Sequence, residues 1–251
     1  MECERSEPKK EQNVHFSTLR VAWLILAVSM AAMFAVSARG ADTQYYTTEF
    51  DGAENPLSEG GVWSHTGLDW AKVAKSNGIA YGTQTGTGGY DDAYAILSGF
   101  LPNQSGSAQV HLSSSIDRSC THEVEILLRW SDSAHTARGY EANINFGGSA
   151  QIVRWNGAIG DFTVLGGASY AGFKHGDTFA ASINGNIIAM YVNGNKIAQL
   201  TDNTYSTGNP GIGFFRRECG TGSDLGFLNY TATGGDGTTV PPTAPANVRV
   251  N

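Results

Sequence analysis

Two glutamates at alternate positions, Glu123 and Glu125, have the residue type and the spacing for acid–base chemistry on a sugar. They fall in segment 122–130, where apolar and polar side chains alternate, a pattern that predicts a strand with one buried face. Alternate strand residues lie about 6.5–7 Å apart, wider than the roughly 5–5.5 Å between the carboxyl groups of a retaining glycosidase. The spacing leaves two hypotheses: an inverting pair, or a polar strand face paired with Arg129 or Arg154.

Other catalytic arrangements are weaker. His111, Arg129 and Tyr140 have the side-chain types of a polysaccharide lyase, which is the second form of the enzyme hypothesis. The sequence has no Gly-x-Ser-x-Gly motif and its 6 histidines are scattered, so nothing indicates a nucleophilic triad.

Sugar binding needs less machinery, namely aromatic rings for the apolar sugar face and polar groups for the hydroxyls. Candidate side chains occur near the ends of predicted strands: Tyr90, Asp91, Asp92, Arg129, Tyr140, Arg154 and Trp155, with Trp70 as an outlier. For each aromatic residue the alternative is packing in the core. Trp63 and Trp130 are assigned to the core, the latter as a continuation of the apolar face of the strand at 122–130.

Metal and cysteine chemistry is sparse. No cofactor is expected beyond a stabilising Ca²⁺, for which the loop carboxylates Asp51 and Asp224 are weak candidates. Cys120 and Cys219 are a disulfide candidate that would close a loop of about a hundred residues, and two buried thiols are the alternative.

The N-terminal segment predicts export. Residues 21–38 form an uncharged apolar run preceded by Lys9, Lys10 and Arg20, so residues 1–40 are expected to be a signal peptide or a membrane anchor. The rest is then secreted or displayed at the cell surface. It carries 11 basic and 19 acidic residues, a charge balance that disfavours nucleic acid as a partner.

The elements that must position these side chains are short strands. The 32 glycines and the 16% of charged residues favour many strands joined by tight turns. Asn184-Gly185 and Asn193-Gly194 predict two successive hairpins, and the closing strand is expected beside the first. Strands are predicted at 45–50, 71–75, 79–81, 93–97, 107–113, 122–130, 140–146, 151–155, 162–165, 178–183, 187–192, 196–200, 211–216 and 225–232.

Several motifs occur together: Gly176-Asp177, Tyr191-Val192-Asn193-Gly194, Gly208-Asn209-Pro210-Gly211, and Tyr140 followed by Arg154-Trp155-Asn156-Gly157. With these motifs, residues 45–233 resemble the concanavalin A-like lectin/glucanase (laminin G-like) jelly rolls of secreted bacterial proteins. The resemblance implies an all-β, two-sheet antiparallel sandwich over 41–233. Glucanases of this fold carry an E-x-D-x-x-E strand motif, whose last glutamate is replaced by Leu128 here.

The tail has a different composition. Residues 234–245 are rich in Gly, Thr and Pro and predict a linker. Residues 246–251 resemble the opening strand of a fibronectin type III domain, which implies a larger multidomain protein.

The sequence therefore predicts an exported carbohydrate-binding or adhesion module that recognises a polysaccharide on a concave sheet face. The alternatives are a polysaccharide-degrading hydrolase or lyase on the same fold, and a structural spacer in a cell-surface array. Fold alone does not decide among them.

Overall fold

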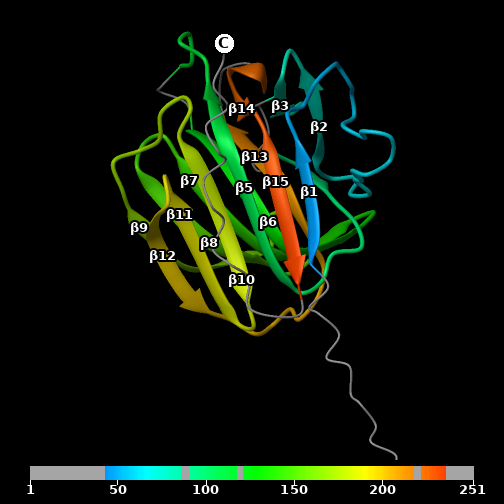
Figure 1. Cartoon of the computed structure of the whole chain (residues 1–251), viewed down its shortest axis with the longest axis vertical. Helices are drawn as coiled ribbons and strands as arrows, with labels where there is room; N and C mark the ends of the chain where they lie inside the picture. The colour runs from blue at the N-terminus through cyan, green and yellow to red at the C-terminus, as the bar shows by residue number, and fades with distance from the viewer. Residues whose placement is uncertain (1–42, 86–90, 118–120, 218–221, 236–251) are drawn as a thin grey trace, which may run out of the picture. The chain divides into compact units, whose positions relative to one another are not determined.

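The structure is a computed structural model that describes residues 43–85, 91–117, 121–217 and 222–235 (Figure 1). Within these ranges no helix is long and apolar enough to span a membrane. The predicted signal or anchor segment at 1–40, most of the linker and the residues at 246–251 lie outside the described ranges.

Fifteen strands and one short 3₁₀ helix, η1, make up the described chain, and they form two layers joined along one edge (Figure 1). The first layer has the order β1 (Gln44–Thr48), β15 (Tyr230–Gly235), β5 (Asn103–Leu112), β10 (Thr178–Asn184), β11 (Ile187–Val192) and β12 (Asn195–Thr201). The second has the order β4 (Asp92–Ile96), β13 (Asn209–Arg217), β6 (Thr121–Ser133), β7 (Thr136–Asn145), β8 (Ser149–Trp155) and β9 (Phe162–Ser169). The joining edge runs through β14 (Leu225–Phe227), β3 (Ile79–Gly82) and β2 (Ala71–Ser76), with η1 (Gly222–Asp224) just before β14.

Local sequence signals account for two of these pairings. The two Asn-Gly turns join β10 to β11 and β11 to β12, and Asn193 and Gly194 both have positive φ, as a tight hairpin turn requires. The closing strand β15 pairs antiparallel with the first strand β1, as predicted, with Gln44 opposite Gly234. The strand β15 also takes in Gly234 and Gly235, which the composition assigns to the linker.

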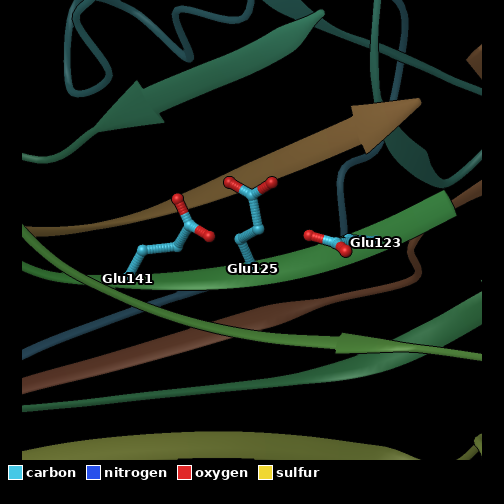
Figure 2. A group of neighbouring side chains, drawn as sticks. All are labelled: Glu123, Glu125 and Glu141. Carbon is cyan, nitrogen blue, oxygen red and sulfur yellow. The ribbon is translucent and has the colours of Figure 1, made fainter. Parts of the chain in front are cut away.

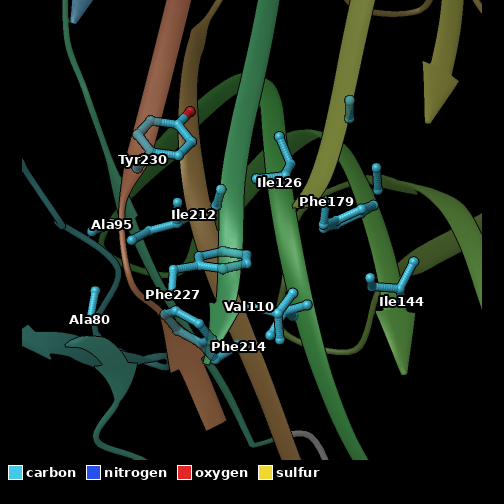
Figure 3. Packing of buried hydrophobic residues seen from close by; sticks show 14 of the residues in the cluster. Ala80, Ala95, Val110, Ile126, Ile144, Phe179, Ile212, Phe214, Phe227 and Tyr230 are labelled. Atoms are coloured by element: carbon cyan, nitrogen blue, oxygen red, sulfur yellow. The ribbon is translucent and has the colours of Figure 1, made fainter. Parts of the chain in front are cut away.

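The main core lies between the two layers (Figure 3). It is built from the inward-facing residues of each strand: Val110 and Phe179 in the first layer face Ile126, Ile144 and Ile212 in the second. Full burial of one such side chain contributes about 1.5–3 kcal/mol. Trp63 belongs to this core, as predicted.

A β-bulge interrupts β6 at Arg129 and corrects two predictions about this strand. Arg129 has a φ of 48°, and the pairing with β7 shifts register between Leu128 and Ser131. Arg129 therefore leaves the face that carries Glu123 and Glu125. Trp130 joins the opposite face from the one predicted, where it packs in a second hydrophobic cluster rather than in the main core.

The disulfide prediction concerns two cysteines next to the ends of β6 and β13, and it stays a prediction. Cys120 and Cys219 lie outside the described residues, but Thr121 pairs with Arg217, so the strands on which the two cysteines border are neighbours. We expect peptide mapping of the unreduced protein to recover one cross-linked peptide containing both cysteines. Recovery of both as free thiols after alkylation of the native protein would contradict this expectation.

Candidate functional site

Three carboxylates from two neighbouring strands meet on the second layer. Glu123 and Glu125 lie on β6 and Glu141 lies on β7, and each offers an oxygen within 4.8 Å of the others. Figure 2 shows the three side chains next to one another, with the carboxylate of Glu125 between the other two. The carboxylates are thus closer together than the 6.5–7 Å expected from strand rise alone, because side chains converge where backbone positions do not.

Strand alternation explains why these groups share a face. Val124 and Ile126 point into the core, so Glu123 and Glu125 point away from it. In the register of β6 with β7, Glu125 lies opposite Asn143, and Glu141 is two residues from Asn143 on the same face. The polar residues of both strands therefore form one patch on the outer face of the layer.

A glycine on the third strand of this patch makes room for Glu125. Gly213 of β13 lies opposite Glu125, and a Cβ atom at this position would collide with Oε2 of Glu125. Any larger residue would push the carboxylate out of its place.

Hydrogen bonds fix Glu141 and leave Glu125 without a partner. Trp155 Nε1 donates to Oε2 of Glu141 at 2.6 Å, and Asn143 Nδ2 donates to Oε1 at 2.7 Å. Glu125 is 2% exposed, and its Oε1 has no hydrogen-bond partner in the described structure. Burial of an unpaired acceptor costs about 1–3 kcal/mol, so this arrangement is not one that stability alone would favour.

The electrostatics of the patch oppose ionisation. Burial, together with the nearby charge of Glu141, raises the pKa of Glu123 to about 7. Burial and the neighbouring carboxylates likewise raise the pKa values of Glu125 and Asp92 well above their ordinary range, and burial raises that of Glu141. Such clustering of raised pKa values is typical of functional sites.

A pocket of about 130 Å³ lies over this patch. Its lining combines carboxyl groups, amides and aromatic rings, and it contains no Lys, Arg or His among the described residues: Asp92, Glu123, Glu141, Asn143, Gln151, Val153, Trp155, Phe162 and Phe215.

The second hydrophobic cluster forms one side of the pocket. Trp155 packs edge to face against both Trp70 and Trp130 along the same outer face, together with Leu127 and Val153. Trp70, the outlier of the sequence analysis, is thus a packing residue. The cluster holds Trp155 in place between the aromatic side and the carboxylates.

The predicted ligand-binding residues divide into two groups. Asp92 and Trp155 line the pocket, although Trp155 is almost fully buried. Arg154, its neighbour in the chain, faces the other way, and its Nη1 donates to Asp202 at 2.8 Å in an ion pair. Tyr140 is also turned inward and its hydroxyl donates to Asp202 at 2.6 Å, so both residues anchor the segment between β12 and β13.

Arg129 is a structural clamp rather than a pocket residue. Its guanidinium donates to the carbonyl oxygens of Pro102, Gly185 and Tyr205 at 2.7–2.9 Å. It pairs with neither Glu123 nor Glu125, which corrects the hypothesis of a glutamate–arginine strand face.

The remaining candidates lie elsewhere. Tyr90 is outside the described residues, and Asp91 does not line the pocket. Asp51 is an exposed turn residue and Asp224 ends η1, so the two weak Ca²⁺ candidates sit on separate segments and neither belongs to the carboxylate cluster. His111 packs against His175, away from Arg129 and Tyr140, so the lyase set is not assembled.

Sequence reasoning missed Glu141, Asn143, Gln151 and Phe215. A signal for the first two was present, because polar residues at 141, 143 and 145 alternate with Tyr140, Ala142 and Ile144. This alternation predicts a polar outer face next to that of β6 once the two strands are paired as a hairpin.

Comparison with solved structures identifies proteins with a similar fold. Neither a sequence model of a protein family nor a curated protein matches the chain. Porphyranase B from Zobellia galactanivorans superimposes with a TM-score of 0.50 at 10% identity, over 76% of this chain and 93% of that one. The fold is a two-sheet jelly-roll sandwich.

Two other jelly rolls align less closely. The carbohydrate-binding module CBM66 from Bacillus subtilis gives a TM-score of 0.49 at 13% identity, over 64% of this chain and 96% of that one. Galectin LEC-6 from Caenorhabditis elegans gives a TM-score of 0.38 at 17% identity, over 55% of this chain and 88% of that one. At such identities the likeness concerns the fold, and the function must be argued from the pocket.

Proposed function

We propose that this jelly roll is an exported carbohydrate-binding module that holds one sugar unit of a glycan in the pocket on its second layer. The observation that carries the proposal is the lining of this pocket. The rings of Phe162 and Phe215 and the amides of Asn143 and Gln151 all line it, a combination that matches a sugar ring with an apolar face and a hydroxyl edge.

The size and charge of the pocket limit the kinds of sugar that it could bind. A volume of about 130 Å³ is below the roughly 300–1,000 Å³ of sites that enclose a whole small molecule, which favours one unit of a longer chain. Three carboxyl groups without a described basic neighbour disfavour uronic acids and sulfated sugars. A neutral or amine-bearing polysaccharide fits best.

Export and a larger parent protein belong to the same proposal. The apolar run at 21–38, the net negative charge and the resemblance of 246–251 to a fibronectin type III strand support it. The jelly-roll proteins named above are carbohydrate-binding or carbohydrate-degrading by their names, which agrees with this role.

Binding should depend on two pocket residues that carry no essential packing. Gln151 and Phe215 are partly buried on β8 and β13. We expect Gln151→Ala and Phe215→Ala each to weaken binding to the best glycan of a plant, algal and bacterial panel about tenfold, as measured by calorimetry, because one hydrogen bond or one ring contact is worth about 1–1.5 kcal/mol. Tyr45→Ala, which removes an exposed ring from β1 in the first layer, is the matched control.

Unchanged affinity in both pocket variants would place the glycan elsewhere, and no binding to any glycan of the panel would leave the spacer hypothesis ahead.

One observation favours hydrolysis as a second candidate function. Glu123 has a pKa of about 7 and lies close to Glu141, and both line the pocket. A protonated acid beside a carboxylate is the pairing a glycosidase uses. The test is release of oligosaccharides in the same binding assays, with Glu123→Gln expected to reduce it about a hundredfold or more. Binding without products would support the module alone.

A further inference from the structure

The carboxylate cluster is short of positive charge. Among the described residues, ion pairs involve Lys75, Arg154 and His135, and none of them reaches Glu123, Glu125 or Glu141. Three carboxylates whose oxygens lie within 4.8 Å of one another cannot all ionise without a counter-charge. The arrangement therefore needs protons or a cation.

Glu125 points to a ligand independently of the cluster. Its carboxylate is buried and aimed between those of Glu123 and Glu141 (Figure 2), and its Oε1 is enclosed without any hydrogen-bond donor. Buried carboxylate oxygens are ordinarily paired. The absence of a side chain at Gly213 leaves room for the other oxygen in this position.

The spacing of the oxygens suits one ion of the size of Ca²⁺. Oxygens bound to the same Ca²⁺ at about 2.4 Å lie at most about 5 Å apart, and the carboxylate oxygens of the three glutamates fall within 4.8 Å of one another. Trp155 and Asn143 hold the carboxylate of Glu141 from outside, which is how orienting hydrogen bonds support metal ligands.

We propose that Glu123, Glu125 and Glu141 bind a divalent cation of the Ca²⁺ type beneath the pocket. Oxygen-only ligands select a hard cation. Glu125 does not line the pocket, so this site needs no glycan and goes beyond the proposed sugar binding.

Terbium luminescence tests the proposal directly, because Tb³⁺ replaces Ca²⁺ and is excited by a nearby indole. Trp155 donates to a ligand carboxylate and is the expected sensitiser. Tb³⁺ added to the purified full-length protein, without any glycan, should give indole-sensitised emission that saturates. Ca²⁺ should displace it at lower concentration than Mg²⁺.

Variants locate the ion. Glu125→Gln and Glu141→Gln should each weaken Tb³⁺ binding at least about tenfold, while Asp51→Asn and Asp224→Asn, which alter the carboxylates predicted from sequence, should leave it unchanged. Far-ultraviolet circular dichroism checks that each variant is folded. Absence of saturable emission, displacement by Mg²⁺ in preference to Ca²⁺, or emission that persists in Glu125→Gln and is lost in Asp51→Asn or Asp224→Asn would overturn the proposal.

Discussion

The free energy of unfolding is expected to fall by at least about 2.5 kcal/mol as the pH is raised from about 5 to about 8 in a chelating buffer. The pKa of Glu123 is about 7 in the folded chain and 4.5 in the unfolded reference. Between these values the folded state binds more protons than the unfolded state. Stability is therefore present in full below the lower value and is lost as the pH rises through the upper one.

The other carboxyl groups act in the same direction. Burial raises the pKa values of Glu125, Glu141 and Asp92 as well, so they add to the fall. Asp202 and Glu54 have lowered pKa values, through hydrogen bonds and nearby cations, and their effect is confined to more acidic solutions. The two groups of carboxyls thus act in separate pH ranges.

Substitution of single glutamates by glutamine measures how much each carboxyl group contributes to the pH dependence of stability. Glu123→Gln and Glu125→Gln should each make the protein more stable at about pH 8 and flatten the slope, as followed by urea denaturation across the pH series. Leu68→Ala, which truncates an exposed side chain that does not ionise, should leave the slope unchanged. Stability that rises between about pH 5 and about pH 8 in the unsubstituted protein would refute the burial of these charges.

Loss of the Arg129 side chain is the second large effect. Arg129→Ala should lower the free energy of unfolding by about 4 kcal/mol or more, because three carbonyl oxygens from three separate segments lose a charged donor at once. Arg129→Lys keeps the charge but not the fork of donors. The lysine variant should therefore lower the free energy of unfolding by less than the alanine variant does, but by more than half as much.

Denaturation and glycan binding together distinguish the clamp from the role that the sequence suggested. The structure places Arg129 outside the pocket, so the folded Arg129→Lys protein should bind glycan with unchanged affinity. A variant that is as stable as the parent and has lost glycan binding would restore Arg129 to the ligand site.

Local patterns were enough to predict most of the strands, while the two-sheet architecture was implied by the family resemblance. Each Asn-Gly turn and each alternating run records a short-range preference, and the strands at 178–183, 187–192 and 196–200 were predicted within two residues of their observed ends. Trp63 was placed in the core by the same logic. The β-bulge at Arg129 was not predictable, because the sequence pattern does not mark a single residue with positive φ. The bulge nevertheless reverses the face on which the next residues of β6 lie.

The candidate site was predicted only in part, for a related reason. Glu123 and Glu125 were found because they are neighbours in sequence, and Asp92 and Trp155 because of their residue types. Glu141 joins them through the register of β6 with β7, and Phe215 joins them through that of β13, which is a pairing of segments about ninety residues apart. The grouping of Tyr140 and Arg154 with Trp155 failed because consecutive strand residues face opposite ways.

The pairing of β1 with β15 has a mechanical consequence. Because Gln44 lies opposite Gly234, the chain enters and leaves the jelly roll at the same point. A pull applied through both ends would open this antiparallel pair one hydrogen bond at a time, like a zipper, instead of shearing many bonds together. The domain is thus poorly built to carry tension that is applied through both of its ends.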